Sequence, residues 1–263
     1  MTNKLRPILV AGILSLFLIS CDKEDEEEKP MIIKPAYAVS ESNGLLIFDP
    51  ESKADIIRTA VAGMQAGENI LGIDVRPANG MLYAIGSNSR IYTINTSTGA
   101  ATFVAALSIP LNGSSFAVDF NPVPDRIRII SNTGQNLRVN PADGATTNDG
   151  AINPTPAAIT AAAYTNSVAG ATTTTLHVID TDADKIFIQN PPNNGTLTMG
   201  MNLGVNADAA NGFDIGGRNG VAYALLSTGN STSLYTINLS TGQASEVRTF
   251  GEKVRGLALG TDF

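Results

Sequence analysis

Cysteine, histidine and tryptophan are nearly absent from this sequence of 263 residues, which has one Cys, one His and no Trp. Cys21 alone cannot form a disulfide within the chain, so burial of apolar side chains must stabilise the fold. Zinc and copper sites that need several His or Cys ligands are excluded. His177 is interpreted as a residue of the core or its rim. The lack of Trp leaves few aromatic rings to stack on a sugar.

Common signatures of catalysis and metal binding are absent as well. The sequence has no phosphate-binding loop, no dinucleotide fingerprint and no Gly-x-Ser-x-Gly nucleophile elbow. One alternating acidic segment resembles the start of a calcium loop, but Lys185 and Pro191 stand where an EF-hand needs Gly and Glu. We therefore predict no metal centre and no cofactor. A solvated turn is favoured over a weak calcium site at Asp180, Asp182 and Asp184.

Basic residues are too few for a nucleic-acid-binding surface. From Met31 onwards the chain has 18 acidic and 13 basic residues, a net charge of −5. Binding to the phosphate backbone needs a positively charged face. The charge balance therefore argues against nucleic acid as a partner.

The first twenty residues are typical of a bacterial targeting segment. A basic start is followed by an apolar run over 8–19, which is too short to span a membrane comfortably. The run ends in Leu-Ile-Ser before Cys21, which resembles the lipobox of bacterial lipoproteins. This resemblance implies cleavage before Cys21, lipid on its thiol and the membrane as a partner. The alternative is an ordinary signal peptide with a chance Cys.

An acidic segment over 22–30 follows Cys21 and contains no apolar residue to bury. Like charges repel, so it is predicted to be a disordered tether. It also resembles the surface-export tag of some lipoproteins, and a plain spacer is an equal alternative. The predicted domains are 1–20 (signal peptide), 21–35 (lipidated Cys and tether) and 36–263 (folded domain). The predicted location is the bacterial cell envelope, where the protein would be an outer-membrane lipoprotein. The surface-export alternative would place it on the outside of the cell.

One pattern recurs five times in the folded domain: a short apolar strand, then Asp or Asn, then a polar turn that usually ends in Gly. The successive anchors are 46, 45, 50 and 48 residues apart. They are Asp49, Asn95, Asn140, Asn190 and Asn238. A period of about 40–50 residues built from strands and turns is typical of propeller blades.

Each repeat reads as four short strands, which the second repeat shows best over 71–77, 81–85, 91–95 and 101–107. The first of these strands recurs at 116–122, 161–166 and 212–216. It recurs once more, alone, at the C-terminus, whereas the repeat that starts at Ala36 lacks it. The sequence therefore predicts an all-β, five-bladed β-propeller of four-stranded antiparallel blades. The C-terminal strand Val254–Leu259 would complete the first blade and remove the exposed sheet edges.

Several motifs resemble the bacterial family called domain of unknown function 4394. They lie at 119–128, which reads Asp-Phe-Asn-Pro-Val-Pro-Asp-Arg-Ile-Arg, and at 136–141, 163–167 and 189–197. The resemblance covers about residues 36–260. It implies a secreted or lipid-anchored propeller-like domain and no particular activity.

Three Asp residues, Asp74, Asp119 and Asp214, occupy equivalent positions in first strands. One hypothesis is a ring of catalytic carboxylates, as in five-bladed glycoside hydrolases. The other is a structural role in which they accept hydrogen bonds from turn amides. Recurrence in several blades favours the structural role, and no Glu of the mature chain lies in a first strand to act as general acid.

The third blade departs from the repeat because Arg replaces the Tyr and Thr of other blades. Arg can bind a carboxylate or phosphate through two parallel hydrogen bonds. One hypothesis is therefore an anion-binding site, and the favoured one is a structural network with Asp119 and Asp125. The candidate ligand-binding residues are Arg126, Arg128, Arg138, Asn121, Gln135 and Asn136.

Together these features favour a non-enzymatic, lipid-anchored binding or scaffold module over an enzyme. Its ligand, whether a small molecule, a glycan or a protein, is not indicated. The alternative is a propeller hydrolase that acts on glycans with the inner-strand Asp residues. No catalytic residue is assigned, and the only modification predicted is lipidation of Cys21.

Overall fold

The computed structural model describes residues 1, 34–53, 55–155, 157–208 and 211–263. The chain divides into two units, Met1–Ile32 and Ile33–Phe263, and the strands described below belong to the second. The predicted signal peptide, Cys21 and most of the predicted tether lie outside the described residues. Among the described residues, no helix combines the length and apolar character that a membrane crossing requires.

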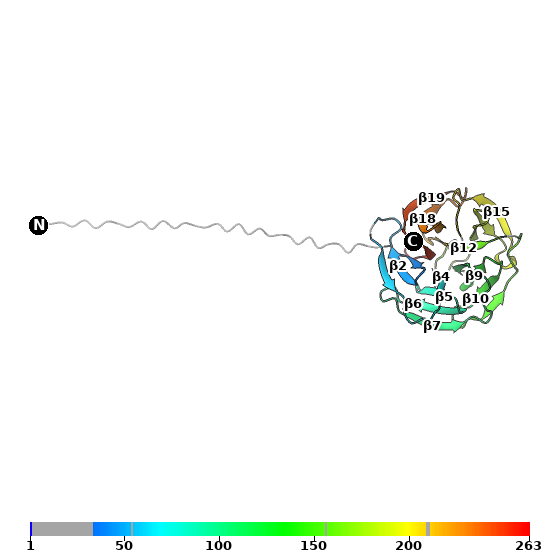
Figure 1. Cartoon of the computed structure of the whole chain (residues 1–263), viewed down its shortest axis with the longest axis horizontal. Helices are drawn as coiled ribbons and strands as arrows, with labels where there is room; N and C mark the ends of the chain where they lie inside the picture. The colour runs from blue at the N-terminus through cyan, green and yellow to red at the C-terminus, as the bar shows by residue number, and fades with distance from the viewer. Residues whose placement is uncertain (2–33, 54, 156, 209–210) are drawn as a thin grey trace. The chain divides into compact units, whose positions relative to one another are not determined.

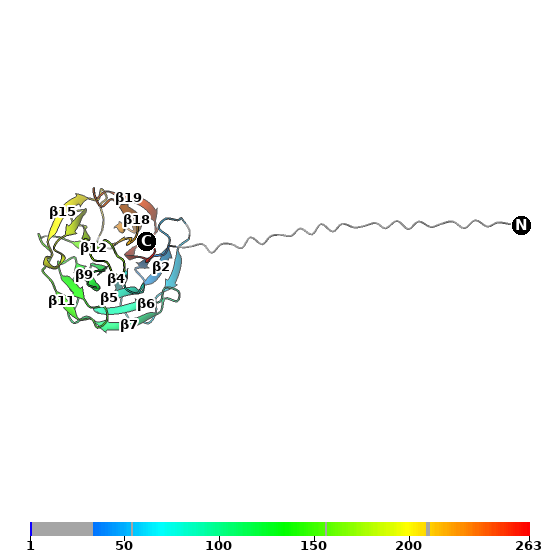
Figure 2. The same ribbon diagram turned by 180° about the vertical axis from the view of Figure 1, so that it is seen from behind.

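Five four-stranded antiparallel sheets form a ring, which is seen down its axis in Figure 1 and from behind in Figure 2. From the axis outwards, blade 1 contains β20 (Val254–Leu259), β1 (Ala36–Ser40), β2 (Gly44–Phe48) and β3 (Ile57–Ala60). Blade 2 contains β4 (Ile70–Val75), β5 (Leu82–Gly86), β6 (Arg90–Ile94) and β7 (Ala101–Ala106).

The other three blades repeat this order. Blade 3 contains β8 (Phe116–Asn121), β9 (Arg126–Ser131), β10 (Asn136–Val139) and β11 (Thr146–Asn148). Blade 4 contains β12 (Ile159–Tyr164), β13 (Leu176–Asp180), β14 (Lys185–Gln189) and β15 (Leu197–Asn202), with a short 3-10 helix at Pro192–Asn194. Blade 5 contains β16 (Gly212–Ile215), β17 (Ala222–Thr228), β18 (Ser231–Ile237) and β19 (Ala244–Thr249).

The predicted five-bladed propeller and its closure are confirmed. Strand β20 pairs antiparallel with β1, from Ala36 opposite Leu259 to Ser40 opposite Val254. The last strand of the chain is therefore the innermost strand of the first blade. This pairing joins the two ends of the domain and closes the ring.

The repeated turn has a specific geometric task. The side chain of Asn95 accepts hydrogen bonds from the backbone amides of Ser97 and Thr98, both at 3.0 Å, which starts the turn. Gly99 ends the turn with a φ of +73° and donates its amide to Asn95. A Cβ at Gly99 would lie 2.2 Å from the backbone oxygen of Ala60 in the preceding blade. Gly is therefore required both by the left-handed backbone and by close packing between blades.

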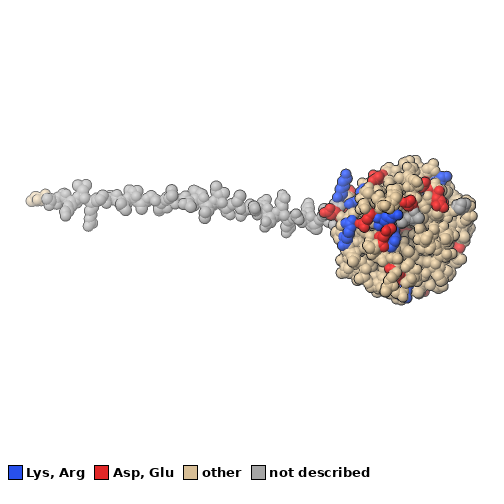
Figure 3. Space-filling view, viewed as in Figure 1, with Lys and Arg blue, Asp and Glu red and all other residues tan. Residues whose placement is uncertain are grey.

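The hydrophobic core lies between neighbouring blades. One buried cluster joins Tyr83 and Ile85 of blade 2 to Phe120 and Ile129 of blade 3. The rings of Tyr83 and Phe120 meet edge to face with their centres 5.2 Å apart. Side chains from both blades thus fill each interface and hold the inner strands close around the axis. On the face shown in Figure 3, charged residues gather over the first blade and the centre, whereas most of the remaining surface is uncharged.

Candidate functional site

The five inner strands place one equivalent residue each near the axis, and three of these residues are Asp. Their equivalence follows from the strand pairing. Each lies opposite the corresponding residue of the second strand of its blade, as Asp74 lies opposite Tyr83. The axial residues in blade order are Ala258, Asp74, Asp119, Ala163 and Asp214. Their second-strand partners are Tyr37, Tyr83, Arg128, His177 and Tyr223.

Each axial carboxylate is hydrogen-bonded to the inner strand of the next blade. Asp74 accepts the amide of Phe120 at 2.7 Å, and Asp119 accepts the amide of Tyr164 at 2.8 Å. Asp214 accepts the amide of Leu259 at 2.6 Å, which links the last repeat to the closing strand. The structural hypothesis for these Asp residues predicts that they accept hydrogen bonds from backbone amides of turns. The donors are instead strand amides: one from the adjacent blade for each Asp, and for Asp74 and Asp214 also the amide of the next residue of the same strand.

The three carboxyl groups form one buried cluster. One oxygen from each of the three lies within 4.8 Å of the others, and all three residues are buried. Burial is the main cause that raises the pKa of each group, to about 7 for Asp214 and well above the usual range for Asp74 and Asp119. Neighbouring carboxylates raise the pKa of Asp74 and Asp119 further. The axis therefore favours protonation of these acids.

Carboxylate oxygens at this spacing are a ligand set that a divalent cation can use. Two of the three residues, Asp74 and Asp214, already accept a backbone amide on each oxygen. The cavity enclosed by the inner strands has a volume of about 10 Å³, roughly the minimum for one water. Glycosidases separate their two carboxyls by about 5–9.5 Å around the scissile bond. The axial Asp residues do not line this cavity and are only 1–3% exposed, so a sugar cannot reach their carboxyl groups in this structure.

Arg128, the centre of the predicted anion site, is buried and surrounded by hydrogen-bond partners. Its Nη1 donates to Asp149 at 2.7 Å and to Asn136 at 2.9 Å. Its Nη2 donates to Asn193 at 2.7 Å, and its Nε donates to Tyr164 at 3.2 Å. The guanidinium thereby joins strands of blade 3 to residues of blade 4. Every nitrogen of Arg128 has a partner within the protein.

The other five predicted ligand-binding residues do not converge on Arg128 as one open site. Asn136 is buried and donates to the backbone oxygens of Gly150 and Pro192, while Gln135 bonds to the backbone of 110–112. Arg126 donates to the backbone oxygens of its own turn. Arg138 shares Asp149 with Arg128, and its buried Nε has no partner. Arg138 and Asn121 line a shallow surface hollow of about 500 Å³, and a ligand there stays a prediction.

The ion-pair partners of this region differ from those expected. Neither Asp119 nor Asp125 pairs with Arg128. Asp149, whose side chain is 6% exposed, pairs with both Arg128 and Arg138. Asp125 pairs with Arg76 of the preceding blade, and that ion pair lowers the pKa of the Asp125 carboxyl. Asp149 follows the short outer strand of blade 3, and nothing in the repeat singles it out.

Two further residues that the sequence singled out, His177 and Asp180, are buried. His177 is buried, burial lowers its pKa, and its Nδ1 has no hydrogen-bond partner. Asp180 is buried and accepts backbone amides from Ala158, Asp182 and Ala183, so it organises the turn. Among the described residues, the acidic segment 180–184 does not form a cluster of three metal-ligating groups.

A polar cup opens at the end of the axis where the inner strands begin. Each of its five main lining residues stands three positions before the axial residue of its blade. They are Arg255, Leu71, Phe116, Thr160 and Asn211, one from every blade, with Ser114 and Ser115 beside them. The cup has a volume of about 80 Å³, enough for several waters or a small organic group. We refer to this space as the mouth cup.

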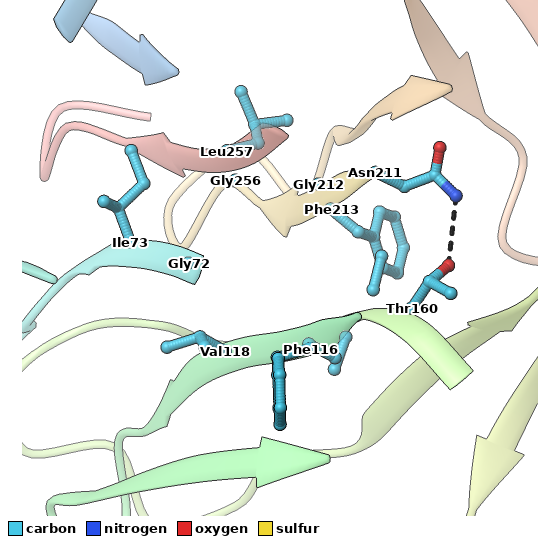
Figure 4. A pocket seen from close by; sticks show the side chains of 13 residues that line it. Gly72, Ile73, Phe116, Val118, Thr160, Asn211, Gly212, Phe213, Gly256 and Leu257 are labelled. Carbon is cyan, nitrogen blue, oxygen red and sulfur yellow. Dashed lines mark hydrogen bonds between the residues drawn. The ribbon is translucent and has the colours of Figure 1, made fainter. Parts of the chain in front are cut away.

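The floor of the mouth cup is made of the smallest residues. The next position along each strand holds Gly or Ala: Gly256, Gly72, Ala117, Ala161 and Gly212. A Cβ on Gly212 would lie 2.5 Å from the amide nitrogen of Leu257, so the strands meet there almost backbone to backbone. Figure 4 shows these glycines around the axis, with the side chains of Asn211 and Thr160 joined at 3.0 Å.

Sequence reasoning missed the mouth cup because its residues lie about one repeat apart. The register of the axial Asp residues was recognised, and a count of three positions back from each would have found them. No shared residue type marks the position, since its occupants are apolar in two blades and polar in three.

The sequence over residues 44–258 matches the family described as Domain of unknown function (DUF4394). The chain belongs to this family. No curated protein matches the DUF4394 chain.

Two solved structures share the propeller fold of this DUF4394 protein. One is a structural genomics protein of unknown function from Bacteroides thetaiotaomicron VPI-5482, with a TM-score of 0.51 and 13% identity. The alignment covers 81% of this chain and 58% of that one, so the chain spans less than two thirds of its length. The other is a chain of a nidogen/laminin complex, with a TM-score of 0.52 and 12% identity over 86% of this chain and 98% of that one. Similarity at this level establishes the fold alone.

The axial acids predict an unusual dependence of stability on pH. A carboxyl whose pKa is raised by folding binds its proton more tightly in the folded chain. Its contribution to stability is complete below the unfolded pKa, about 3.9, and is lost as pH rises through the folded pKa. For Asp214 that pKa is about 7, so we expect the free energy of unfolding to fall between pH 4 and pH 7. Thermal or urea unfolding at a series of pH values measures this.

A matched pair of variants assigns this slope. Asp214→Ala copies the residue that blades 1 and 4 carry at this position, and it should flatten the slope between pH 4 and pH 7. Asp182→Ala removes an exposed acid and should leave the slope unchanged. A wild-type stability that rises with pH over this range would contradict the assignment, as would an unaltered slope in Asp214→Ala.

The Arg128 network predicts a large loss of stability when its centre is removed. Arg128→Met removes one of the two Arg partners of the buried Asp149 side chain, which then keeps only Arg138, and breaking a buried pair typically costs about 3–5 kcal/mol. For a domain of this size we expect a decrease in melting temperature of roughly 6–20 °C. Arg126→Met, which loses only bonds to its own turn, should change stability by less than about 0.5 kcal/mol. An unchanged or higher melting temperature for Arg128→Met would instead indicate repelling charges kept for an anionic ligand.

Proposed function

We propose that this protein is a lipid-anchored, extracytoplasmic propeller that binds a ligand and performs no catalysis. Its proposed location is the bacterial cell envelope, on the outer membrane, with lipid on Cys21. The ligand-binding end is the mouth cup. One contrast along the inner strands carries the proposal. The axial carboxylates are occupied by backbone amides, whereas the mouth cup at the start of the same strands is open.

The axial Asp residues have the chemistry of catalysis but the environment of structural residues. Asp74 and Asp214 each hold two backbone amides, one of them from the next blade. General acid–base work needs a group that reaches a substrate proton within about 3 Å. The axial Asp residues are only 1–3% exposed, which leaves a substrate no such approach.

The mouth cup has the features expected of a binding site. All five blades contribute to it, so its geometry is fixed by a closed ring of paired strands. Its wall combines apolar and polar side chains, which is the usual composition of small-ligand sites. Asn211 is held from three directions, because its Nδ2 donates to Thr160 and to the backbone oxygen of Asp208, and its Oδ1 accepts the amide of Ser227.

The anchor is tested by metabolic labelling with a palmitate analogue in a host that processes lipoproteins. We expect the wild-type chain to carry the label in the membrane fraction and Cys21→Ser to lose it, because only the thiol can form the thioether. Ser20→Ala keeps a small residue before Cys21 and should remain labelled. An unlabelled wild type, or label that persists in Cys21→Ser, would refute the anchor.

The alternative, a glycan hydrolase that uses Asp74, Asp119 and Asp214, is tested by turnover. We expect no hydrolysis across a panel of oligosaccharides, because the axial acids are enclosed by the inner strands. Suppose instead that the wild type hydrolyses a glycan, and that the Asn variant of each axial Asp remains folded but inactive. The proposal of a non-enzymatic module would then be wrong.

A further inference from the structure

Arg255 is the charged residue of the mouth cup, and part of its hydrogen-bonding capacity is unused. It belongs to β20, the closing strand, and lines the cup with Asn211 and Thr160. Its Nε is buried and has no hydrogen-bond partner, while one Nη lies 3.4 Å from the Asn43 side-chain oxygen, a long contact. A buried N–H without an acceptor is costly and rare in folded proteins.

The electrostatic surroundings leave the Arg255 charge incompletely balanced. Burial is the main influence on Arg255 and lowers its pKa, and the nearby carboxylate of Glu41 acts in the opposite direction with a smaller effect. The guanidinium nevertheless stays charged, because arginine is not deprotonated in proteins. Among the described residues that line the mouth cup, only Arg255 carries a charge. The axial acids stand three residues further along the strands, about 10 Å away.

The wall of the cup has two sides of different character. Asn211 of blade 5 neighbours Arg255 in the ring, Thr160 of blade 4 comes next, and both are buried polar residues. Ser114 and Ser115 add hydroxyl groups beside Phe116 of blade 3. Leu71 and Phe116 supply apolar surface on the blades that follow Arg255 in the other direction. A ligand that fits this wall carries one anionic group and an adjoining apolar part.

We propose that the mouth cup binds the carboxylate group of a small, partly apolar molecule, and that the Arg255 guanidinium donates to it. This inference rests on the proposed function and specifies the ligand class of the same site. The bound carboxylate would balance the Arg255 charge and replace the hydration that burial removes. Thr160 of blade 4, and Ser114 and Ser115 before the inner strand of blade 3, add hydroxyl groups to the lining of the cup.

A carboxylate suits this site better than a phosphate does. The described lining contributes a single positive charge, which matches a monoanion, and phosphate sites usually gather several cationic or amide donors. Two sources share this chemistry: a free short-chain acid and the C-terminal carboxylate of a peptide. The volume of about 80 Å³ is enough for the carboxylate end of either one.

The test is an NMR titration of the protein as it is purified from the envelope, in detergent, with ¹⁵N-labelled arginine side chains. The probes are propionate, the dipeptide N-acetyl-Ala-Ala with a free carboxylate, the same dipeptide as its carboxamide, and inorganic phosphate. Sodium chloride keeps the ionic strength constant. We expect propionate or the free dipeptide to shift the Arg255 Nε–H signal until it saturates. The carboxamide should produce no shift, because it lacks the charge.

Three variants assign the effect to Arg255. Arg255→Met should weaken carboxylate binding by at least about tenfold, the factor expected for loss of one hydrogen bond to a charged group. Arg255→Lys keeps the charge without the planar donors and should give an intermediate loss. Arg90→Met removes the same charge from β6, outside the cup lining, and should leave binding within about twofold of wild type. In uniformly ¹⁵N-labelled protein, the backbone amide shifts of Thr160 and Asn211 follow binding in the Met variant, and a melting curve verifies that each variant is folded.

Each outcome decides for or against the inference. A saturable shift with propionate supports a free acid as the ligand, and a shift with the free dipeptide alone supports a chain terminus. Saturation by phosphate without carboxylate binding would overturn the ligand class, as would equal binding by acid and carboxamide or unchanged affinity in folded Arg255→Met. No shift with any probe would also overturn it. None of these outcomes changes the lipid-labelling and turnover results, so failure of the inference is distinguishable from failure of the proposed function.

Discussion

The hydrogen bond that an axial carboxylate accepts from a backbone amide of the next blade is the contact on which the ring depends. Asp74, Asp119 and Asp214 each extend from one inner strand to its neighbour, and Asp214 reaches the closing strand β20. This link opposes the repulsion and desolvation of three acids whose oxygens lie within 4.8 Å of one another. Five acids at this position would concentrate still more charge. Ala163 and Ala258 occupy the two remaining places, where hydrophobic packing between blades suffices.

The fold was predictable because its signals are local. An Asn followed by Gly a few residues later fixes a turn, as Asn95 and Gly99 do, and the spacing of such turns fixes the number of blades. The missing inner strand of the first repeat and the unpaired strand at the C-terminus together predict closure. Each of these inferences needs only the chemistry of neighbouring residues and a count along the chain.

The partners of the Arg cluster were not predictable in the same way. Arg128 was recognised because it replaces Tyr in the repeat, but its acid, Asp149, lies in a segment after β11 that varies between blades. The path of that segment is set by packing against 192–194 of blade 4, where Asn136 and Arg128 also find acceptors. A sequence reveals that a buried charge needs a partner. It does not reveal which of several acids the chain brings near.

Repetition along the inner strands separates the parts that build the ring from the part that can recognise a ligand. The floor position is Gly or Ala in every blade, because crowding at the axis admits nothing larger. The axial position is Asp in three blades and Ala in two, since its task is hydrogen bonding within a limited charge. One residue before the floor, the strands diverge from one another and the space widens, so five different side chains are tolerated. Closure of the ring, which confines the floor and axial positions, also holds the five side chains of the mouth cup in a fixed arrangement. A nearly symmetric scaffold thereby forms a site that has one cation and a wall with both polar and apolar parts.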